Sequence, residues 1–206
     1  MNSKKVRDRT PEELQIRKEE FLKICDILDN HRLTYYLHGG VLLGAVREKG
    51  FIKWDWGVDI RVKSIELLEN IDTLKKSLEK SDFKILDIRK KKDDLKIYFS
   101  GKYPKEISAY TIFGWNYSKT KDIYWREKYS IPSKFFNQHS TIDLFGREFK
   151  CPLNPEEYLT YAYGNWKVPL RTDDKVLYNS NKNFKIAFDE DIKEKIKKIY
   201  SIFKKK

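Results

Sequence analysis

Residues 35–60, YYLHGGVLLGAVREKGFIKWDWGVDI, bring together a glycine pair, an apolar helical turn and two aspartates close to tryptophans. The pattern predicts a short strand at residues 35–37 and a helix at residues 41–47, which Gly50 ends. Gly39 and Gly40 lie between the two elements. A helix that begins directly after two glycines presents free backbone N–H groups, and such groups bind anions. We therefore expect an anion site at this corner.

The second half of the stretch places acidic side chains on a strand. Residues 55–60, DWGVDI, predict a strand on which positions 55, 57 and 59 share one face, because side chains alternate along a strand. That face carries Asp55, Gly57 and Asp59. In a straight strand the backbones of the two aspartates lie about 13 Å apart. A bulge at Gly57 is therefore needed if both carboxylates are to bind one metal ion.

The stretch resembles the LicD and fukutin-related family of the nucleotidyltransferase superfamily, whose members look like GGxLLGAxRxxGxIxWDxDxDI. The resemblance implies an α/β (α+β) fold with a mixed β-sheet flanked by helices. It also implies a Mg²⁺-dependent transfer of a phosphate-bearing group, such as phosphocholine or ribitol phosphate, from a CDP-activated donor to a glycan hydroxyl. Gly57 stands where the family usually has an aspartate. The matching residues are Gly39, Gly40, Leu42, Leu43, Gly44, Ala45, Arg47, Gly50, Ile52, Trp54, Asp55, Asp59 and Ile60.

A second block of the family pattern, FxGxxxxxPxxPExYLxxxYGxxWxxP, is similar to residues 145–169. Only Asn165 separates Gly164 from Trp166, where the family often has two residues. Together the two blocks cover most of one domain, so we expect residues 1–206 to form a single domain with a core at 10–113 and a second family region at 124–171. The matches in this block are Phe145, Gly146, Pro152, Pro155, Glu156, Tyr158, Leu159, Tyr163, Gly164, Trp166 and Pro169.

The resemblance implies catalytic and metal-binding roles for three acidic residues, Asp59, Asp55 and Glu106. Asp59 is the firmest of these, because an acid within an apolar strand is costly unless it is paired or bound to a metal. Glu106 is the nearest counterpart of a third carboxylate that the family has on the neighbouring strand. Asp93 and Asp94 are alternatives for that position.

The resemblance also implies that Gly39, Gly40 and Arg47 bind the nucleotide. The glycines would let the phosphates approach the backbone. Arg47 would pair with the phosphates through its planar guanidinium, or else brace Asp59. His38 precedes the glycines, but a single histidine is more often structural, and we assign it no acid-base role.

The remaining sequence predicts helices and strands that surround this core. A capping box at residues 10–13 begins a helix that extends to about Asn30. Residues 142–149 predict a hairpin, and residues 124–136 have no regular pattern. The further expected elements are a helix capped by Ser64, strands at 83–88, 95–99 and 106–113 that extend the sheet in antiparallel fashion, a helix from Asn154 to Gly164, and a basic amphipathic helix at 189–206.

The overall composition fits a single folded domain with an anionic ligand. The net charge is +12, and 40% of the residues are hydrophobic. We find no apolar run long enough for a membrane span and no secretory signal, so we expect a cytoplasmic protein. The basic helix at 189–206 would allow peripheral contact with an anionic membrane. Cys25 and Cys151 are too few for a disulfide framework, and we expect buried free thiols.

Three functions therefore follow from the sequence. The first is a transferase that uses a CDP-linked donor and a glycan acceptor with Mg²⁺. The second is a catalytically impaired relative that binds nucleotide or glycan, because Gly57 replaces an acid. The third is a nucleotidyltransferase acting on RNA, which the basic charge allows, although no RNA-binding signature is present and nucleic acid is the least expected partner.

Overall fold

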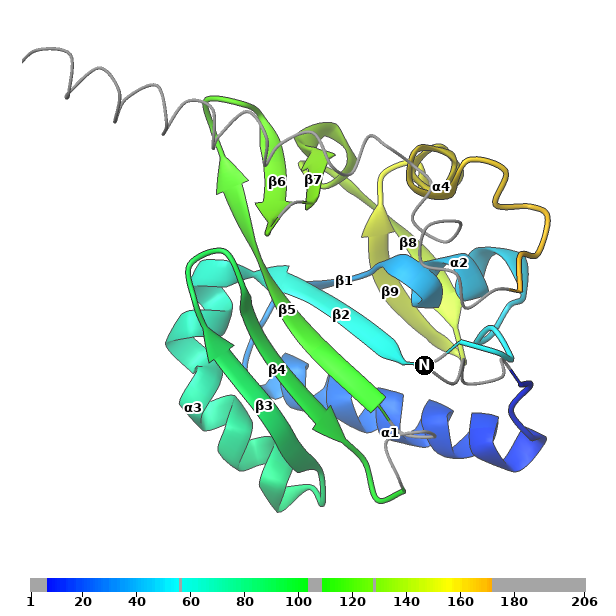
Figure 1. The fold of residues 1–206 in the computed structure, drawn as a ribbon, viewed down its shortest axis with the longest axis vertical. Coiled ribbons are helices and arrows are strands. Elements are labelled where there is room, and N and C mark those ends of the chain that lie inside the picture. Colours follow the sequence, from blue (N-terminus) through cyan, green and yellow to red (C-terminus); the bar gives the residue numbers. More distant parts are fainter. Residues whose placement is uncertain (1–6, 56, 104–108, 128, 172–206) are drawn as a thin grey trace, which may run out of the picture.

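A computed structural model describes residues 7–55, 57–103, 109–127 and 129–171 of the chain. Its centre is a mixed β-sheet whose main path has the strand order β1-β2-β5-β4-β3 (Figure 1). β2 and β5 are parallel, and the other neighbouring strands of this path are antiparallel. The strands are β1 (Tyr35–Leu37), β2 (Val58–Lys63), β3 (Lys84–Lys90), β4 (Leu95–Ser100) and β5 (Ala109–Ser118).

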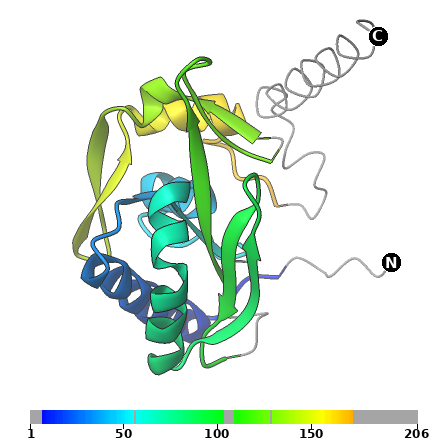
Figure 2. The same cartoon turned by 90° about the vertical axis from the view of Figure 1, so that its left-hand side faces the viewer.

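Two helices cover one face of this sheet. α1 (Pro11–Asn30) and α3 (Ser64–Lys80) contact each other, and α3 also packs on β2, β3, β4 and β5 (Figure 2). Val58, Ile60 and Val62 of β2 are buried in the core, and the alternate residues of the strand lie on the other face. That second face therefore carries the polar side chains of β2.

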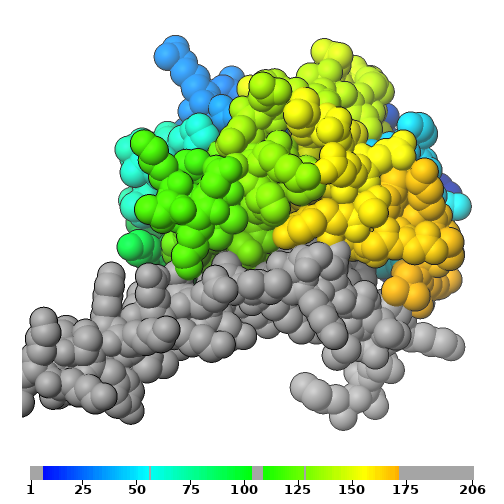
Figure 3. Space-filling model, turned by 90° about the horizontal axis from the view of Figure 1, so that it is seen from above, coloured from blue at the N-terminus to red at the C-terminus, as the bar shows by residue number. Residues whose placement is uncertain are grey.

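The opposite side of the molecule holds a second group of elements. α2 (Gly39–Arg47) contacts β2, α4 (Pro155–Tyr163) and the hairpin of β8 (His139–Leu144) and β9 (Arg147–Pro152). β6 (Ile123–Arg126) and β7 (Tyr129–Pro132) extend β5, and a 3₁₀ turn at Ser133–Phe135 follows. Seen from above, the green surface of this region borders the yellow surface of β9 and α4 (Figure 3).

Many of the expected elements are confirmed. α1 begins with the predicted capping box, in which Thr10 accepts from the Glu13 backbone and Glu13 accepts from the Thr10 backbone. β1, the β8–β9 hairpin and α4 lie where the sequence places them, and Gly164 ends α4 with a φ of 66°. Cys25 and Cys151 are free and buried.

Several predictions were wrong. Lys63, not Ser64, is the N-cap residue of α3. The strand expected from Asp55 begins at Val58, because residues 52–55 form a turn in which the Asp55 N–H donates to Ile52 at 3.1 Å. The strands after α3 do not all add antiparallel, since β5 pairs with β2 in parallel. Residues 124–136 are not irregular but include most of β6, all of β7 and the 3₁₀ turn.

Two predictions fall on parts of the chain that the structure does not describe. Glu106 and the basic helix at 189–206 both lie outside the described residues. None of the helices within the described ranges combines the length and the apolar character that crossing a bilayer requires.

Candidate active site

The diglycine corner, Gly39 and Gly40, lies beside the start of β2. Leu37 at the end of β1 pairs with Ile60, so the residues that follow Leu37 continue toward Val58 and Asp59. Gly39 has a φ of 61°, a left-handed backbone that suits glycine. α2 begins at this residue, two positions earlier than predicted, and its free N–H groups therefore lie next to the first acid of β2.

Gly40 is required by the close approach of Asp55. A Cβ atom at position 40 would lie 2.0 Å from Asp55 Oδ2, so any larger residue would displace the carboxylate. Arg17 on α1 is fully buried and donates to the Asp55 backbone carbonyl at 3.0 Å. The Asp55 carboxylate also favours the cationic forms of Arg9 and Arg17. Asp55 thus joins α1 to the diglycine corner.

Asp59 is the exposed carboxylate of the site. Surrounding protein displaces part of its water and the nearby Asp55 charge repels it, so its pKa is raised to about 6, although a hydrogen bond with Thr111 opposes the shift. Solvent still reaches the side chain, which fits a carboxylate set among neighbouring elements rather than enclosed in the core. The charge of Asp55 thus acts on Asp59. A turn before β2, and no bulge within the strand, separates the two predicted acids.

Cations lie close to this pair of acids. Arg126 and Lys96 both act to lower the pKa of Asp59. Arg126 also forms an ion pair with Asp94 and stacks on Phe113 at 4.2 Å. Asp94 forms a second ion pair, at 2.9 Å, with Arg89. The candidate site therefore has cations that can bind phosphate and carboxylates that can bind a metal ion.

The third carboxylate is not found in the described part of the chain. Thr111 of β5 is the register partner of Asp59 on the neighbouring strand. Asp94, one of the alternatives, is used in ion pairs with Arg126 and Arg89. Within the described ranges no three His, Cys, Asp or Glu side chains come together as a metal site would require.

Gly57 lies directly before β2 and next to β5. A Cβ atom at this position would lie 3.2 Å from the Ala109 carbonyl oxygen and 3.8 Å from the Ala109 Cβ atom. The backbone there is not left-handed, so a side chain needs only a small adjustment of its neighbour. A side chain at position 57 therefore requires the Ala109 backbone to move by a few tenths of an ångström.

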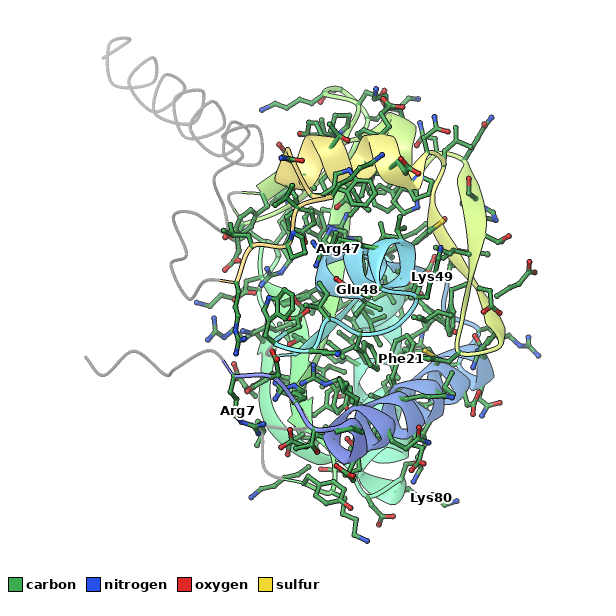
Figure 4. The ribbon with its side chains drawn as sticks, turned by 90° about the vertical axis from the view of Figure 1, so that its right-hand side faces the viewer. Arg7, Phe21, Arg47, Glu48, Lys49 and Lys80 are labelled. Carbon is green, nitrogen blue, oxygen red and sulfur yellow. The ribbon has the colours of Figure 1, made fainter. Side chains whose placement is uncertain are left out.

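Arg47 lies at the far end of α2 from the diglycine corner. Arg47 and Glu48 are neighbours at this end of the helix (Figure 4), and the Arg47 Nε atom pairs with Glu48 at 2.8 Å. The Arg47 Nη1 atom donates to the Trp166 carbonyl at 2.9 Å. These contacts fasten α2 to the segment after α4. They give Arg47 a structural role, and its contact with the nucleotide or brace to Asp59 stays a prediction.

The sequence did not identify Arg61 as a residue of the site. Arg61 follows Asp59 by two positions, lies on the same face of β2 and is only 4% exposed. Its Nη2 atom is hydrogen-bonded to His38 Nε2, and its guanidinium carbon lies 3.4 Å from the centre of the Trp115 ring. The alternation Asp59, Arg61, Lys63 within an apolar strand was the available signal.

Two solved structures have a similar fold. The first is the lincosamide antibiotic adenylyltransferase LnuA in its lincomycin-bound form, with a TM-score of 0.50, 15% identity and coverage of 86% of this chain and 99% of that one. The second is the antibiotic-resistance factor ANT(2″)-Ia, with a TM-score of 0.51, 14% identity and coverage of 93% of each chain. At these identities the likeness establishes the nucleotidyltransferase-like fold alone.

Sequence comparison identifies the family. The lipopolysaccharide cholinephosphotransferase LicD of Haemophilus influenzae is 36% identical over 62 residues, which cover 27% of this chain and 23% of that protein. The matched part is therefore about a quarter of the curated relative. The model of the LicD/FKTN/FKRP nucleotidyltransferase domain matches residues 32–154, more than half of the chain. This chain belongs to the LicD/FKTN/FKRP nucleotidyltransferase-domain family.

Proposed function

We propose that this protein transfers a phosphate-linked group from a CDP-activated donor to a hydroxyl of a cell-surface glycan or its precursor. The single observation that carries the proposal is the Asp55 carboxylate lying against Gly40 at the start of α2, and the charge of Asp55 also acts on Asp59. Phosphoryl transfer depends mainly on positioning and on charge neutralisation, and this corner combines groups suited to both. Family membership supports the same class of reaction.

The acids at the corner fit a single Mg²⁺ ion better than a pair of ions. Mg²⁺ is commonly held by one or two carboxylates together with substrate phosphates and water, and the electrostatically coupled Asp59 and Asp55 provide such a set. Asp59 would be the main ligand because it is exposed, whereas Asp55 also faces Arg9 and Arg17. When bound, the ion would neutralise charge on the donor's diphosphate.

The residues of this chain supply the remaining requirements of the reaction. The free N–H groups at the start of α2 would bind phosphate oxygens. Lys96 and Arg126 would add positive charge near Asp59. In the reaction the acceptor oxygen bonds to the transferred phosphorus, the bond between that phosphorus and the bridging oxygen breaks, and CMP leaves with the bridging oxygen while the hydroxyl proton is released.

The proposal is tested by measuring CMP release from CDP-choline and CDP-ribitol with a panel of oligosaccharide acceptors, with and without Mg²⁺. We expect Mg²⁺-dependent release by the natural protein and a loss of at least about a hundredfold in Asp59→Asn, since preorganised electrostatic groups are worth about that much. Asp143→Asn is the matched control, because Asp143 lies on the exposed side of the β8–β9 hairpin. Equal rates for Asp59→Asn and the natural protein would contradict the proposal.

A second candidate function is a catalytically impaired relative that binds nucleotide or glycan. Gly57 and Thr111 favour it, because neither supplies an acid beside Asp59. The variant Gly57→Asp separates the two functions, since the backbone accepts a side chain there with a small adjustment. Turnover by this variant together with no turnover by the natural protein would select the impaired relative.

A further inference from the structure

A pocket of about 270 Å³ lies next to the candidate active site on the polar face of the sheet. Arg61, Val62, Trp115 and Phe136 are its buried residues, and Lys63 and Asn137 are exposed residues of its lining. We call it the Arg61 pocket. Its volume is near the lower end of the range for small-molecule sites, and larger than a bare phosphate requires. The full lining is Tyr36, Arg61, Val62, Lys63, Trp115, Tyr124, Phe136 and Asn137.

Arg61 is a buried cation without a counter-charge in the described part of the chain. Its Nε and Nη1 atoms are buried and have no hydrogen-bond partner among the described residues, and no carboxylate there forms an ion pair with it. Burial lowers its pKa to about 9, although the nearby tyrosines Tyr158 and Tyr163 favour the cation. A buried charge that is not paired costs several kcal/mol. Something outside the described chain is therefore expected to compensate it.

The contacts that Arg61 does make orient it without neutralising it. Burial and the Arg61 charge hold the pKa of His38 well below its ordinary value, so the imidazole stays neutral and its Nε2 atom accepts from the guanidinium. The Trp115 and Phe136 rings lie 3.4 and 5.0 Å from the guanidinium carbon. Cation–π contacts of this kind stabilise a cation only in part.

The Arg61 pocket adjoins the candidate active site along one strand. Arg61 and Asp59 are separated by about 6.6 Å at the backbone, since they occupy alternate positions of β2 on the same face. Tyr36, the register partner of Arg61, lies two residues before His38 and the diglycine corner. A molecule in the pocket can therefore extend toward the phosphate groups expected at that corner.

We propose that the Arg61 pocket binds an anionic sugar unit of the acceptor, carrying a carboxylate or a phosphate. The aromatic rings of Tyr36, Trp115 and Tyr124 offer flat surfaces for the apolar face of a sugar, while the guanidinium compensates the negative group. The cations Arg61 and Lys63 disfavour a positively charged head group. The description of the ligand as the acceptor rests on the proposed transferase function. The anionic class rests on Arg61 alone.

The direct test is the binding of small sugars to the natural protein, measured by calorimetry and by tryptophan fluorescence. We expect glucuronate and glucose 6-phosphate each to bind at least about tenfold more tightly than glucose, because a charge-assisted hydrogen bond contributes at least that factor. CMP should not compete with them. Equal binding of glucose and the two acidic sugars would overturn the proposal, and displacement by CMP would assign the pocket to the donor instead.

Arg61→Met tests the residue itself. We expect it to weaken binding of the acidic sugars about tenfold to a hundredfold. Its melting temperature without ligand should equal or exceed that of the natural protein, because a buried uncompensated charge is removed. Lys150→Met is the matched control, since Lys150 is an exposed strand lysine on β9 that does not line the pocket.

The outcomes for the variants are distinct. Unchanged binding in Arg61→Met, or an equal loss in Lys150→Met, would overturn the assignment. A clear drop in melting temperature for Arg61→Met would make Arg61 a structural cation and remove the basis of the proposal. These measurements need neither donor nor metal, so a failure here leaves the transferase proposal standing, and failure of turnover leaves sugar binding measurable.

Discussion

At the scale of single residues, the site depends on the close contact between Gly40 and Asp55. The carboxylate lies where a side chain at position 40 would begin, and the backbone of Asp55 accepts from the buried Arg17. The two positions thus require glycine for different reasons. Gly39 is needed for its left-handed backbone, and Gly40 is needed for space.

Gly40→Ala should displace the Asp55 carboxylate, because the new Cβ atom would lie 2.0 Å from Oδ2. We expect a loss of about 1–3 kcal/mol in the free energy of unfolding, as for other overpacked sites. Gly50→Ala is the control, since its nearest neighbour would be an ordinary contact at 3.9 Å. Urea denaturation measures both variants, and equal midpoints would contradict the tight contact.

His38 should make the stability depend on pH. Burial and Arg61 lower its pKa in the folded protein, whereas the unfolded chain has the ordinary pKa of about 6.5. Below that pH the unfolded state takes up a proton that the folded state does not, so stability falls as the pH falls.

His38→Gln keeps an acceptor for Arg61 but cannot titrate. The natural protein should lose about 1 kcal/mol relative to this variant between pH 7.5 and pH 5.5. Asp59 is present in both proteins, so its own titration cancels in the difference. Parallel curves of unfolding free energy against pH would show that His38 is not held neutral.

The sequence points to some residues of the candidate site and misses others. Gly39, Gly40 and Asp59 follow from local spacing. Arg61 does not, because its role depends on its contacts with Trp115 and Phe136. These two residues are distant in the sequence and come together only through the sheet and the turn after β7.

At the scale of elements, local signals in the sequence predict the helices. They fail for strands whose position depends on pairing with a distant strand. The capping box fixes the start of α1, because two backbone donors find partners within four residues. The short strands β6 and β7 were missed, since an aromatic stretch without alternation gives no local sign of its partner β5. The start of β2 was predicted at Asp55 but lies at Val58, because residues 52–55 form a turn.

Thr10→Ala should destabilise the protein by about 1 kcal/mol, because the Glu13 N–H loses its acceptor at the start of α1. Thr73→Ala is the control, since Thr73 is exposed within α3 and donates only to the nearby Asn70 carbonyl. Thermal unfolding of the two variants compares these positions. A smaller effect for Thr10→Ala than for Thr73→Ala would contradict the role of the cap.

At the scale of the whole molecule, topology places the candidate site. The chain leaves β2 through α3, forms β3 and β4, and returns as β5, which lies parallel to β2. This return sets Thr111 beside Asp59 and brings Arg126 close to both. The family resemblance predicts a mixed sheet, but the pairing of β2 with β5 involves residues about fifty positions apart and has no local signature.

The central claim is that Asp59 and the diglycine corner together bind a metal-chelated diphosphate. Crystals soaked with CDP and Mn²⁺, a stand-in for Mg²⁺ with a strong anomalous signal, test it most directly. We predict an anomalous peak within coordination distance of Asp59, with the diphosphate at the N-terminus of α2. A diphosphate bound away from that corner, or a peak with no contact to Asp59, would contradict the claim.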